Sequence, residues 1–293
     1  VRPVEGVSFA VARGETYALL GESGCGKSMT ALALMRLLPD GGRIRSGAVR
    51  LAGGDLLALP ESGMREVRGG RLGMIFQEPM LALNPVMTVG AQIVEALARH
   101  RGLAGRGARA EARRLLDAVG VPDAERRLDA YAFELSGGLR QRAMIAQALA
   151  GEPELLIADE PTTALDVTIQ AQVLDVLRRL KTERQMGMLL ITHDLGVVAE
   201  NADRVGVMYA GELVEEGARD VFFASPQHPY SRMLFEALPR PGDGGRLTTI
   251  PGQVPKLDEP MRGCRFAPRC PHAVARCREE SPDWQERNGQ LVR

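Results

Sequence analysis

The sequence predicts an α/β fold with a mainly parallel sheet and an inserted block of helices. Short apolar runs typical of strands alternate with stretches of helical periodicity in the first and last thirds of the chain. Between them, residues 78–150 show helical periodicity alone. The chain has 293 residues, of which 45% are apolar and 25% charged, so it can bury a sizeable core and hold more than one domain.

We divide the chain into three parts on this pattern. Residues 1–77 and 151–238 form the α/β core, residues 78–150 the helical subdomain, and residues 239–293 a Cys- and Pro-rich C-terminal tail. Glycine turns separate short strands in the first part, beginning with residues 7–11, which predicts antiparallel strands on the N-terminal side of the core. Because this strand follows the first residue almost at once, we expect further residues to precede it.

The stretch from Gly21 to Ser28 reads G-x-x-x-x-G-K-S and lies between an apolar run and a segment of helical periodicity. Strand, glycine loop and helix in this order form a phosphate-binding loop, which predicts a P-loop NTPase core. The glycines let the loop aim N–H groups inward, and the helix adds the positive end of its dipole. Lys27 would contact the β- and γ-phosphates of ATP, and Ser28 would ligate Mg²⁺. A glycine turn without a ligand is the weaker alternative. The residues predicted to bind the nucleotide are Gly21, Glu22, Ser23, Gly24, Cys25, Gly26, Lys27, Ser28 and Met29.

Cys25 lies in this loop, whereas the other three cysteines lie in the tail. An unpaired cysteine at a nucleotide site and the lack of a basic-then-apolar signal segment predict a reducing cytoplasm. We interpret Cys25 as a small loop residue. A redox role is the alternative, because a helix N-terminus lowers the pKa of a thiol.

Helical periodicity in the middle block is clearest over residues 89–101, 108–119 and 140–150. Arginines give part of this block a basic face: Arg99, Arg101, Arg106, Arg109, Arg113 and Arg114. A solvated helix surface is favoured, because no aromatic residues interleave with them as single-strand binding requires. The 37 basic and 37 acidic residues of the chain also cancel, so we expect no nucleic-acid partner.

Residues 155–158 form an apolar run that predicts a strand and ends in Asp159 and Glu160. An aspartate at the carboxyl end of a core strand can hold Mg²⁺ through water beside Ser28, and the glutamate after it can polarise an attacking water. The pair alone is a weak signal, because acidic residues often end strands.

Further strands are predicted at residues 187–192, which end in His193, and at residues 204–217, which read as two strands around a glycine turn. Asp166 is placed to cap the helix that precedes the first of these strands.

A second anion cradle is predicted at residues 135–138, which read Leu-Ser-Gly-Gly before a helix. Ser136, Gly137 and Gly138 would present their N–H groups at the positive end of the helix dipole. A protein with one phosphate site needs one such cradle, so two cradles in one chain indicate two half-sites.

These elements resemble those of the ATP-binding subunit of an ABC transporter, and together they cover residues 15–217. They are the phosphate loop, Gln77 after a strand, the LSGG run, Asp159 with Glu160, Asp166, and His193. The resemblance implies a head-to-tail dimer, in which ATP on the phosphate loop of one subunit is closed over by Ser136, Gly137 and Gly138 of the other.

The same resemblance implies a role for each remaining residue of the predicted site. Gln77 would sense the γ-phosphate and Mg²⁺ and link to the membrane partner. Glu160 would be the catalytic base, and His193 would steady the γ-phosphate and the attacking water. Asp159 would complete the Mg²⁺ site, and Asp166 would cross the dimer interface.

Four segments are similar to the dipeptide and oligopeptide importer branch of this family: residues 77–80, 83–85, 226–231 and 263–271. The similarity implies a subunit that powers peptide import from the cytoplasmic face of the bacterial inner membrane. The implied partners are a second ATPase subunit (a copy or a paralogue), two transmembrane permease subunits and, indirectly, a peptide-binding protein. An importer of another small solute, such as a nickel chelate, is an alternative.

The tail begins with a proline- and glycine-rich stretch at residues 239–245, which predicts a linker. It continues with Cys264, Cys270 and Cys277. This part of the chain resembles the tail of the importer branch, which can hold a four-iron four-sulfur cluster through four cysteines. Three thiolates fit iron–sulfur or zinc only if a fourth ligand is present, and His272 is a substitute with tight geometry. Free thiols or a merely structural cap remain the third interpretation.

A soluble ABC ATPase that acts on nucleic acid or ribosomes is the alternative from another functional class. The neutral charge balance and the lack of a long coiled-coil insertion argue against it. No run of about 18 apolar residues occurs, so any role at a membrane requires partner subunits. The adenine contact stays unassigned, because Phe9 and Tyr17 lie in strand patterns that face the core.

Overall fold

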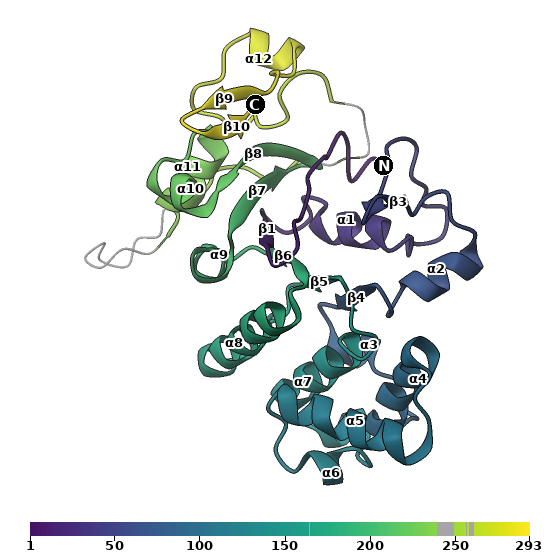
Figure 1. Cartoon of the computed structure of the whole chain (residues 1–293). Helices are drawn as coiled ribbons and strands as arrows, with labels where there is room; N and C mark the ends of the chain where they lie inside the picture. The colour runs from purple at the N-terminus through teal and green to yellow at the C-terminus, as the bar shows by residue number, and fades with distance from the viewer. Residues whose placement is uncertain (164, 239–248, 256, 258–260) are drawn as a thin grey trace. The chain divides into compact units, whose positions relative to one another are not determined.

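The computed structural model describes residues 1–163, 165–238, 249–255, 257 and 261–293 (Figure 1). The chain forms two compact units, and each is built from segments that are distant in the sequence. The first unit contains Val1–Ala10, Thr16–Thr30 and Ile191–Arg293, and the second contains Val11–Glu15 and Ala31–Leu190.

The first unit carries strands in the order β1-β7-β8-β10-β9. Strand β1 (Thr16–Leu20) runs parallel to β7 (Arg204–Tyr209), and β7 is antiparallel to β8 (Glu212–Ala218). The hairpin of β9 (Gln285–Arg287) and β10 (Gln290–Val292) extends the sheet through β8. The two strands predicted within residues 204–217 are confirmed.

Helices of the first unit cover a core of large aromatic side chains. They are α9 (Leu195–Asn201), α10 (Arg219–Ala224) and α11 (Pro229–Glu236). The unit also contains the short helix α12 (Arg276–Glu279), and α1 (Lys27–Leu34) begins at the end of the glycine loop. Tyr209, Phe222, Tyr230 and Phe266 are almost completely buried in this core. Because Phe266 comes from the tail, the tail is an integral part of the unit.

The second unit contains the parallel pair of β4 (Leu72–Ile75) and β5 (Leu155–Asp159), with β6 (Gly187–Thr192) beside β5. A separate antiparallel pair is formed by β2 (Arg50–Leu51) and β3 (Gly54–Asp55). All of β4 and β6 are buried, as expected for apolar strands covered on both faces. The α/β class with a mainly parallel sheet and a separate antiparallel pair is therefore confirmed.

The rest of the second unit is helical. Its helices are α2 (Glu61–Val67), α3 (Pro79–Ala82), α4 (Val89–Arg101), α5 (Gly105–Ala118), α6 (Ala124–Arg127), η1 (Ala132–Glu134), α7 (Gly137–Ala148) and α8 (Val167–Arg184). Helices α4, α5 and α7 pack together, and their apolar faces are buried. No helix in the described part of the chain is long and apolar enough to cross a membrane.

Local sequence signals explain where several of these helices begin and end. Helix α4 begins after Thr88, whose side chain accepts a hydrogen bond from Ala91 N at 3.2 Å, and ends at Gly102 in the left-handed conformation (φ 64°). Helices α5 and α7 both begin before the predicted residues 108 and 140. The residues that follow the glycines favour the helix, namely alanine and arginine in α5 and leucine, arginine and glutamine in α7.

The prediction of a strand at residues 7–11 is wrong, because the structure assigns no strand to these residues. The apolar pattern instead reflects a side-chain contact, in which the Phe9 ring stacks on the Tyr17 ring at a centroid distance of 4.9 Å. The linker predicted at residues 239–245 lies outside the described residues.

Candidate functional site

The glycine loop between β1 and α1 packs closely against neighbouring backbone. A Cβ atom on Gly21 would lie 2.2 Å from the Met208 carbonyl oxygen, and one on Gly26 would lie 2.2 Å from the Pro3 carbonyl oxygen. Gly26 also has φ 106°, which L side chains rarely adopt. The loop shape therefore depends on glycine at these two positions.

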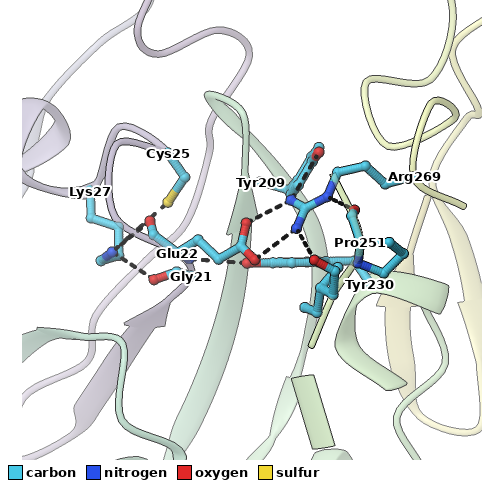
Figure 2. A network of polar contacts seen from close by, with 9 residues as sticks. Gly21, Glu22, Cys25, Lys27, Tyr209, Tyr230, Pro251 and Arg269 are labelled. Atoms are coloured by element: carbon cyan, nitrogen blue, oxygen red, sulfur yellow. Dashed lines mark hydrogen bonds and ion pairs between the residues drawn. The ribbon is translucent and has the colours of Figure 1, made fainter. Parts of the chain in front are cut away.

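Lys27 points its ammonium group back into the loop. Its Nζ donates to the carbonyl oxygens of Gly21 at 2.7 Å and Glu22 at 3.1 Å, and its side chain is almost fully buried (Figure 2). A buried cation beside an exposed loop tip at Ser23 and Gly24 favours an anionic ligand. Ser28 follows in the first turn of α1.

Cys25 and Met29 complete the predicted loop residues. Cys25 is fully buried, and burial raises the pKa of its thiol. A buried thiol of raised pKa is a poor nucleophile, so the interpretation of Cys25 as a small loop residue is favoured over the redox alternative. Met29 is partly buried in the first turn of α1.

Glu22 contacts the rest of the first unit through both its side chain and its backbone (Figure 2). Its carboxylate accepts two hydrogen bonds from the Arg269 guanidinium, at 2.7 and 3.1 Å. Its backbone N–H donates to the Tyr230 hydroxyl at 3.0 Å. The loop is therefore attached to both α11 and the C-terminal tail.

His193 follows β6 directly and is exposed. The next residue, Asp194, caps α9 by accepting hydrogen bonds from Gly196 N at 2.7 Å and Val197 N at 3.3 Å. The cap fixes where the helix begins, so His193 lies between the end of β6 and the start of α9.

Gln77 and Glu160 are brought together in the second unit. Gln77 Nε2 donates to Glu160 Oε2 at 3.2 Å, and the Thr163 hydroxyl donates to the same oxygen at 2.8 Å. Asp159 and Glu160 are both largely buried at the end of β5. Glu160 has φ 45°, a left-handed conformation that is uncommon for glutamate and is typical of functional sites.

The LSGG run lies at the N-terminus of α7. Ser136 is the N-cap residue, is exposed, and makes no side-chain cap hydrogen bond. A Cβ atom on Gly138 would lie 2.9 Å from Ile169 Cγ2, whereas one on Gly137 would meet nothing within 4 Å. A side chain at position 138 would therefore displace Ile169, whereas the open space at Gly137 leaves the helix end accessible.

Asp166 caps α8, as predicted, by accepting a hydrogen bond from Ile169 N at 3.0 Å. Its side chain is exposed.

The tail cysteines, Cys264, Cys270 and Cys277, are free and partly buried. Cys264 N donates to the Cys277 carbonyl oxygen at 2.8 Å, so these two backbones are adjacent. Within the described ranges, however, no three His, Cys, Asp or Glu side chains are grouped as a metal ion requires. These residues do not fit an iron–sulfur or zinc site, and no chemistry is assigned to one.

Several residues of this arrangement were not identified from the sequence, and Thr163 and Arg269 are two of them. Thr163 contacts Glu160 from the same turn, and its place three residues after a strand-end carboxylate is a local signal that could have indicated it. Arg269 contacts Glu22 from a distant part of the chain, so no local pattern could have indicated that pair.

Comparison with known proteins gives matches over most of the chain. The profile of the ABC transporter family matches residues 4–163, and that of the oligopeptide/dipeptide transporter C-terminal region matches residues 214–277. A provisionally named peptide import ATP-binding protein of Brucella abortus is 50% identical, over 100% of this chain and 89% of that protein. A provisionally named peptide ABC transporter ATP-binding protein of Sinorhizobium fredii is 54% identical, over 97% of this chain and 86% of that protein.

A solved structure is also similar. It is a dimeric ATP-binding cassette in a post-hydrolysis state, bound to ADP and phosphate. The TM-score is 0.67 and the identity 26%, over 74% of this chain and 90% of that chain.

Proposed function

Because this chain belongs to the ABC transporter family, we propose that it is the ATP-hydrolysing subunit of a membrane transporter that imports dipeptides or oligopeptides. The match of its C-terminal region to oligopeptide/dipeptide transporters and the names of its relatives support the peptide substrate. The glycine loop with its buried Lys27 ammonium is the observation that carries ATP binding.

In this proposal the loop residues bind ATP. N–H groups of the loop and the first turn of α1 bind the phosphates, and Lys27 turns from its loop carbonyls to the β- and γ-phosphates. Ser28, Asp159 and Gln77 would hold Mg²⁺. The ion would neutralise charge on the phosphates as the terminal phosphoryl group leaves.

Hydrolysis is assigned to Glu160, which accepts a proton from the attacking water. Hydrogen bonds from Gln77 and Thr163 to Oε2 hold this carboxylate in one orientation. His193 would donate a hydrogen bond to the γ-phosphate and so stabilise the charge that develops there.

Dimerisation is assigned to Ser136, Gly137, Gly138 and Asp166. The Ser136 side chain is not used to cap α7, so it is available to a γ-phosphate bound by another ATPase subunit. The dimeric state of the similar cassette structure supports this assignment. The second subunit is a copy of this chain or a paralogue.

The remaining partners follow from peptide import. Two transmembrane permease subunits form the path for the peptide, and a peptide-binding protein delivers it. This chain would then lie at the cytoplasmic face of the bacterial inner membrane. The iron–sulfur cluster has no role in the proposal, because the described cysteines are not grouped to hold it.

Copurification and transport test this function. We expect the tagged chain to copurify with two membrane permease subunits, and vesicles containing the complex to take up peptide only with internal ATP. Uptake should be lost with Lys27→Ala. Salt-sensitive binding to nucleic acid without copurifying membrane subunits would support the soluble ABC ATPase instead. Uptake of a nickel chelate but not of peptide would contradict the substrate class.

A further inference from the structure

Glu22 in the phosphate loop is held through its backbone and its side chain. Its carbonyl oxygen accepts from Lys27 Nζ at 3.1 Å, and its N–H donates to the Tyr230 hydroxyl at 3.0 Å (Figure 2). Its carboxylate binds both terminal nitrogens of Arg269. The position of the carbonyl that receives the Lys27 ammonium is therefore linked to the position of the carboxylate that binds Arg269.

Arg269 is itself held firmly in the tail. Its side chain is only 5% exposed, and its Nε donates to the Pro251 carbonyl oxygen at 2.9 Å. One terminal nitrogen also donates to the Ile250 carbonyl oxygen at 3.3 Å, and the guanidinium lies over the Tyr209 ring at 5.7 Å. A planar guanidinium fixed in this way can orient a carboxylate through two parallel hydrogen bonds, which a lysine cannot do.

The same tail segment is anchored a second time through Arg265. Its NH1 donates to the Ala210 carbonyl oxygen at 2.5 Å, and its Nε lies 3.3 Å from Glu212 Oε1. The next residue after Ala210, Gly211, donates its N–H to the Cys25 carbonyl oxygen at 2.8 Å. The segment therefore reaches the loop at Glu22 directly and at Cys25 through the β7–β8 turn.

We propose that Arg269 is a positioning residue of the phosphate loop, which holds the loop through Glu22 in the shape that binds ATP. The C-terminal tail then sets the affinity of the loop for nucleotide. This inference rests on the proposed function, because it takes the loop to be the ATP site. Arg269 contacts the loop at the Glu22 carboxylate, so it acts on the nucleotide through the loop.

The test uses the full-length protein for the Kd for MgATP and for the melting temperature. It uses the complex that contains two ATPase subunits for KM and kcat. We expect Arg269→Ala to raise Kd and KM about tenfold and to change kcat less than about twofold, because ATP binding must then also order the loop. Arg269→Lys should give an intermediate KM, because lysine keeps the positive charge but cannot form the two parallel hydrogen bonds of the guanidinium.

Arg276→Ala is the matched control. Arg276 is a tail arginine that forms an exposed pair with Glu280, so its loss should leave Kd, KM and kcat unchanged. Glu22→Gln removes the charge of the partner and should also raise KM. The double variant of Arg269→Ala and Glu22→Gln should have a KM no higher than that of the more affected single variant, because the two substitutions remove the same interaction.

Two results would overturn the inference. One is a lower melting temperature for Arg269→Ala with an unchanged Kd, which would make the pair merely structural. The other is a double variant in which the effects of Arg269→Ala and Glu22→Gln on KM add. If Arg269→Ala does not fold, the test rests on Glu22→Gln, and an unchanged Kd for MgATP in that variant would contradict the inference. Failure of the wild-type protein to bind MgATP would instead contradict the proposed function.

Discussion

Glu160 combines burial with an unusual backbone conformation at the end of β5. A left-handed glutamate costs about 1 kcal/mol relative to the ordinary helical or extended regions. Hydrogen bonds to Oε2 from Gln77 and Thr163 accompany this strain and fix the direction of the carboxylate. A base held in one orientation needs little reorganisation when water attacks.

Gly26 and Gly24 provide a matched test of the loop. Both have positive φ, but a Cβ atom on Gly26 would lie 2.2 Å from the Pro3 carbonyl oxygen, whereas one on Gly24 meets nothing within 4 Å. Gly24→Ala should cost about 1 kcal/mol of strain. Gly26→Ala should cost more and weaken MgATP binding by at least about tenfold, because the backbone must move. Calorimetric titration of both variants checks this, and equal losses of affinity would contradict the steric argument.

At the scale of single residues, the site residues that could be predicted from the sequence lie in contiguous motifs. Gly21, Lys27 and Ser28 lie together in the sequence, so their spacing alone placed them between a strand and a helix. The ion pair of Glu22 with Arg269 joins the loop to the tail, and many side chains could have filled either position. Such a pair depends on the three-dimensional path of the chain, which local pattern does not contain.

Helix α11 depends on a buried histidine at its N-terminus. His228 Nδ1 accepts a hydrogen bond from Tyr230 N at 3.1 Å, and its backbone N–H donates to the buried Glu215 carboxylate at 2.9 Å. Burial lowers the pKa of His228 from 6.5 to about 4. The folded protein therefore holds this imidazole neutral under mildly acidic conditions, where the unfolded chain would protonate it.

This depressed pKa predicts an acid-sensitive stability. Between pH 6.5 and 4 the unfolded chain binds the proton and the folded chain does not, so stability present above pH 6.5 falls as the pH falls, by about 3 kcal/mol at most. His228→Asn keeps a capping side chain that does not titrate. Denaturant unfolding at pH 7, 5.5 and 4.5 should show a shallower decline for this variant. Parallel declines in the two proteins would rule out His228 as the cause.

At the scale of elements, the apolar periodicity located the strand that ends at Asp159, the strand that ends directly before His193, and the helix α4. The periodicity wrongly predicted a strand at residues 7–11. The apolar residue Phe9 in this segment stacks on the Tyr17 ring instead of lying in a strand. The hairpin β9–β10 was also missed. Its turn has φ 50° at Asn288 and 73° at Gly289, and an Asn-Gly pair is a strong signal for such a turn. The charged residues that flank it hid the strand pattern.

The whole molecule is incomplete as an ATPase under the proposed function. Ser136 would act on ATP held by another subunit, so turnover by one chain requires a second. The assignment of residues 78–150 to a helical subdomain and of residues 239–293 to a tail stays a prediction. The burial of Phe266 and Arg269 within the first unit argues that the tail contributes to the stability of that unit.

ATP-dependent association of the Glu160→Gln variant tests the central claim most directly. The variant is measured by analytical ultracentrifugation, together with any second ATPase subunit that copurifies, alongside its ATP turnover. We expect turnover to fall at least about a hundredfold while ATP binding is kept, because the base is lost. ATP, but not ADP, should convert the 31.7 kDa chain to a species containing two ATPase subunits, and Glu200→Gln, at an exposed position, should behave like the wild type. A Glu160→Gln protein that stays monomeric with saturating ATP and hydrolyses it at the wild-type rate would contradict the account.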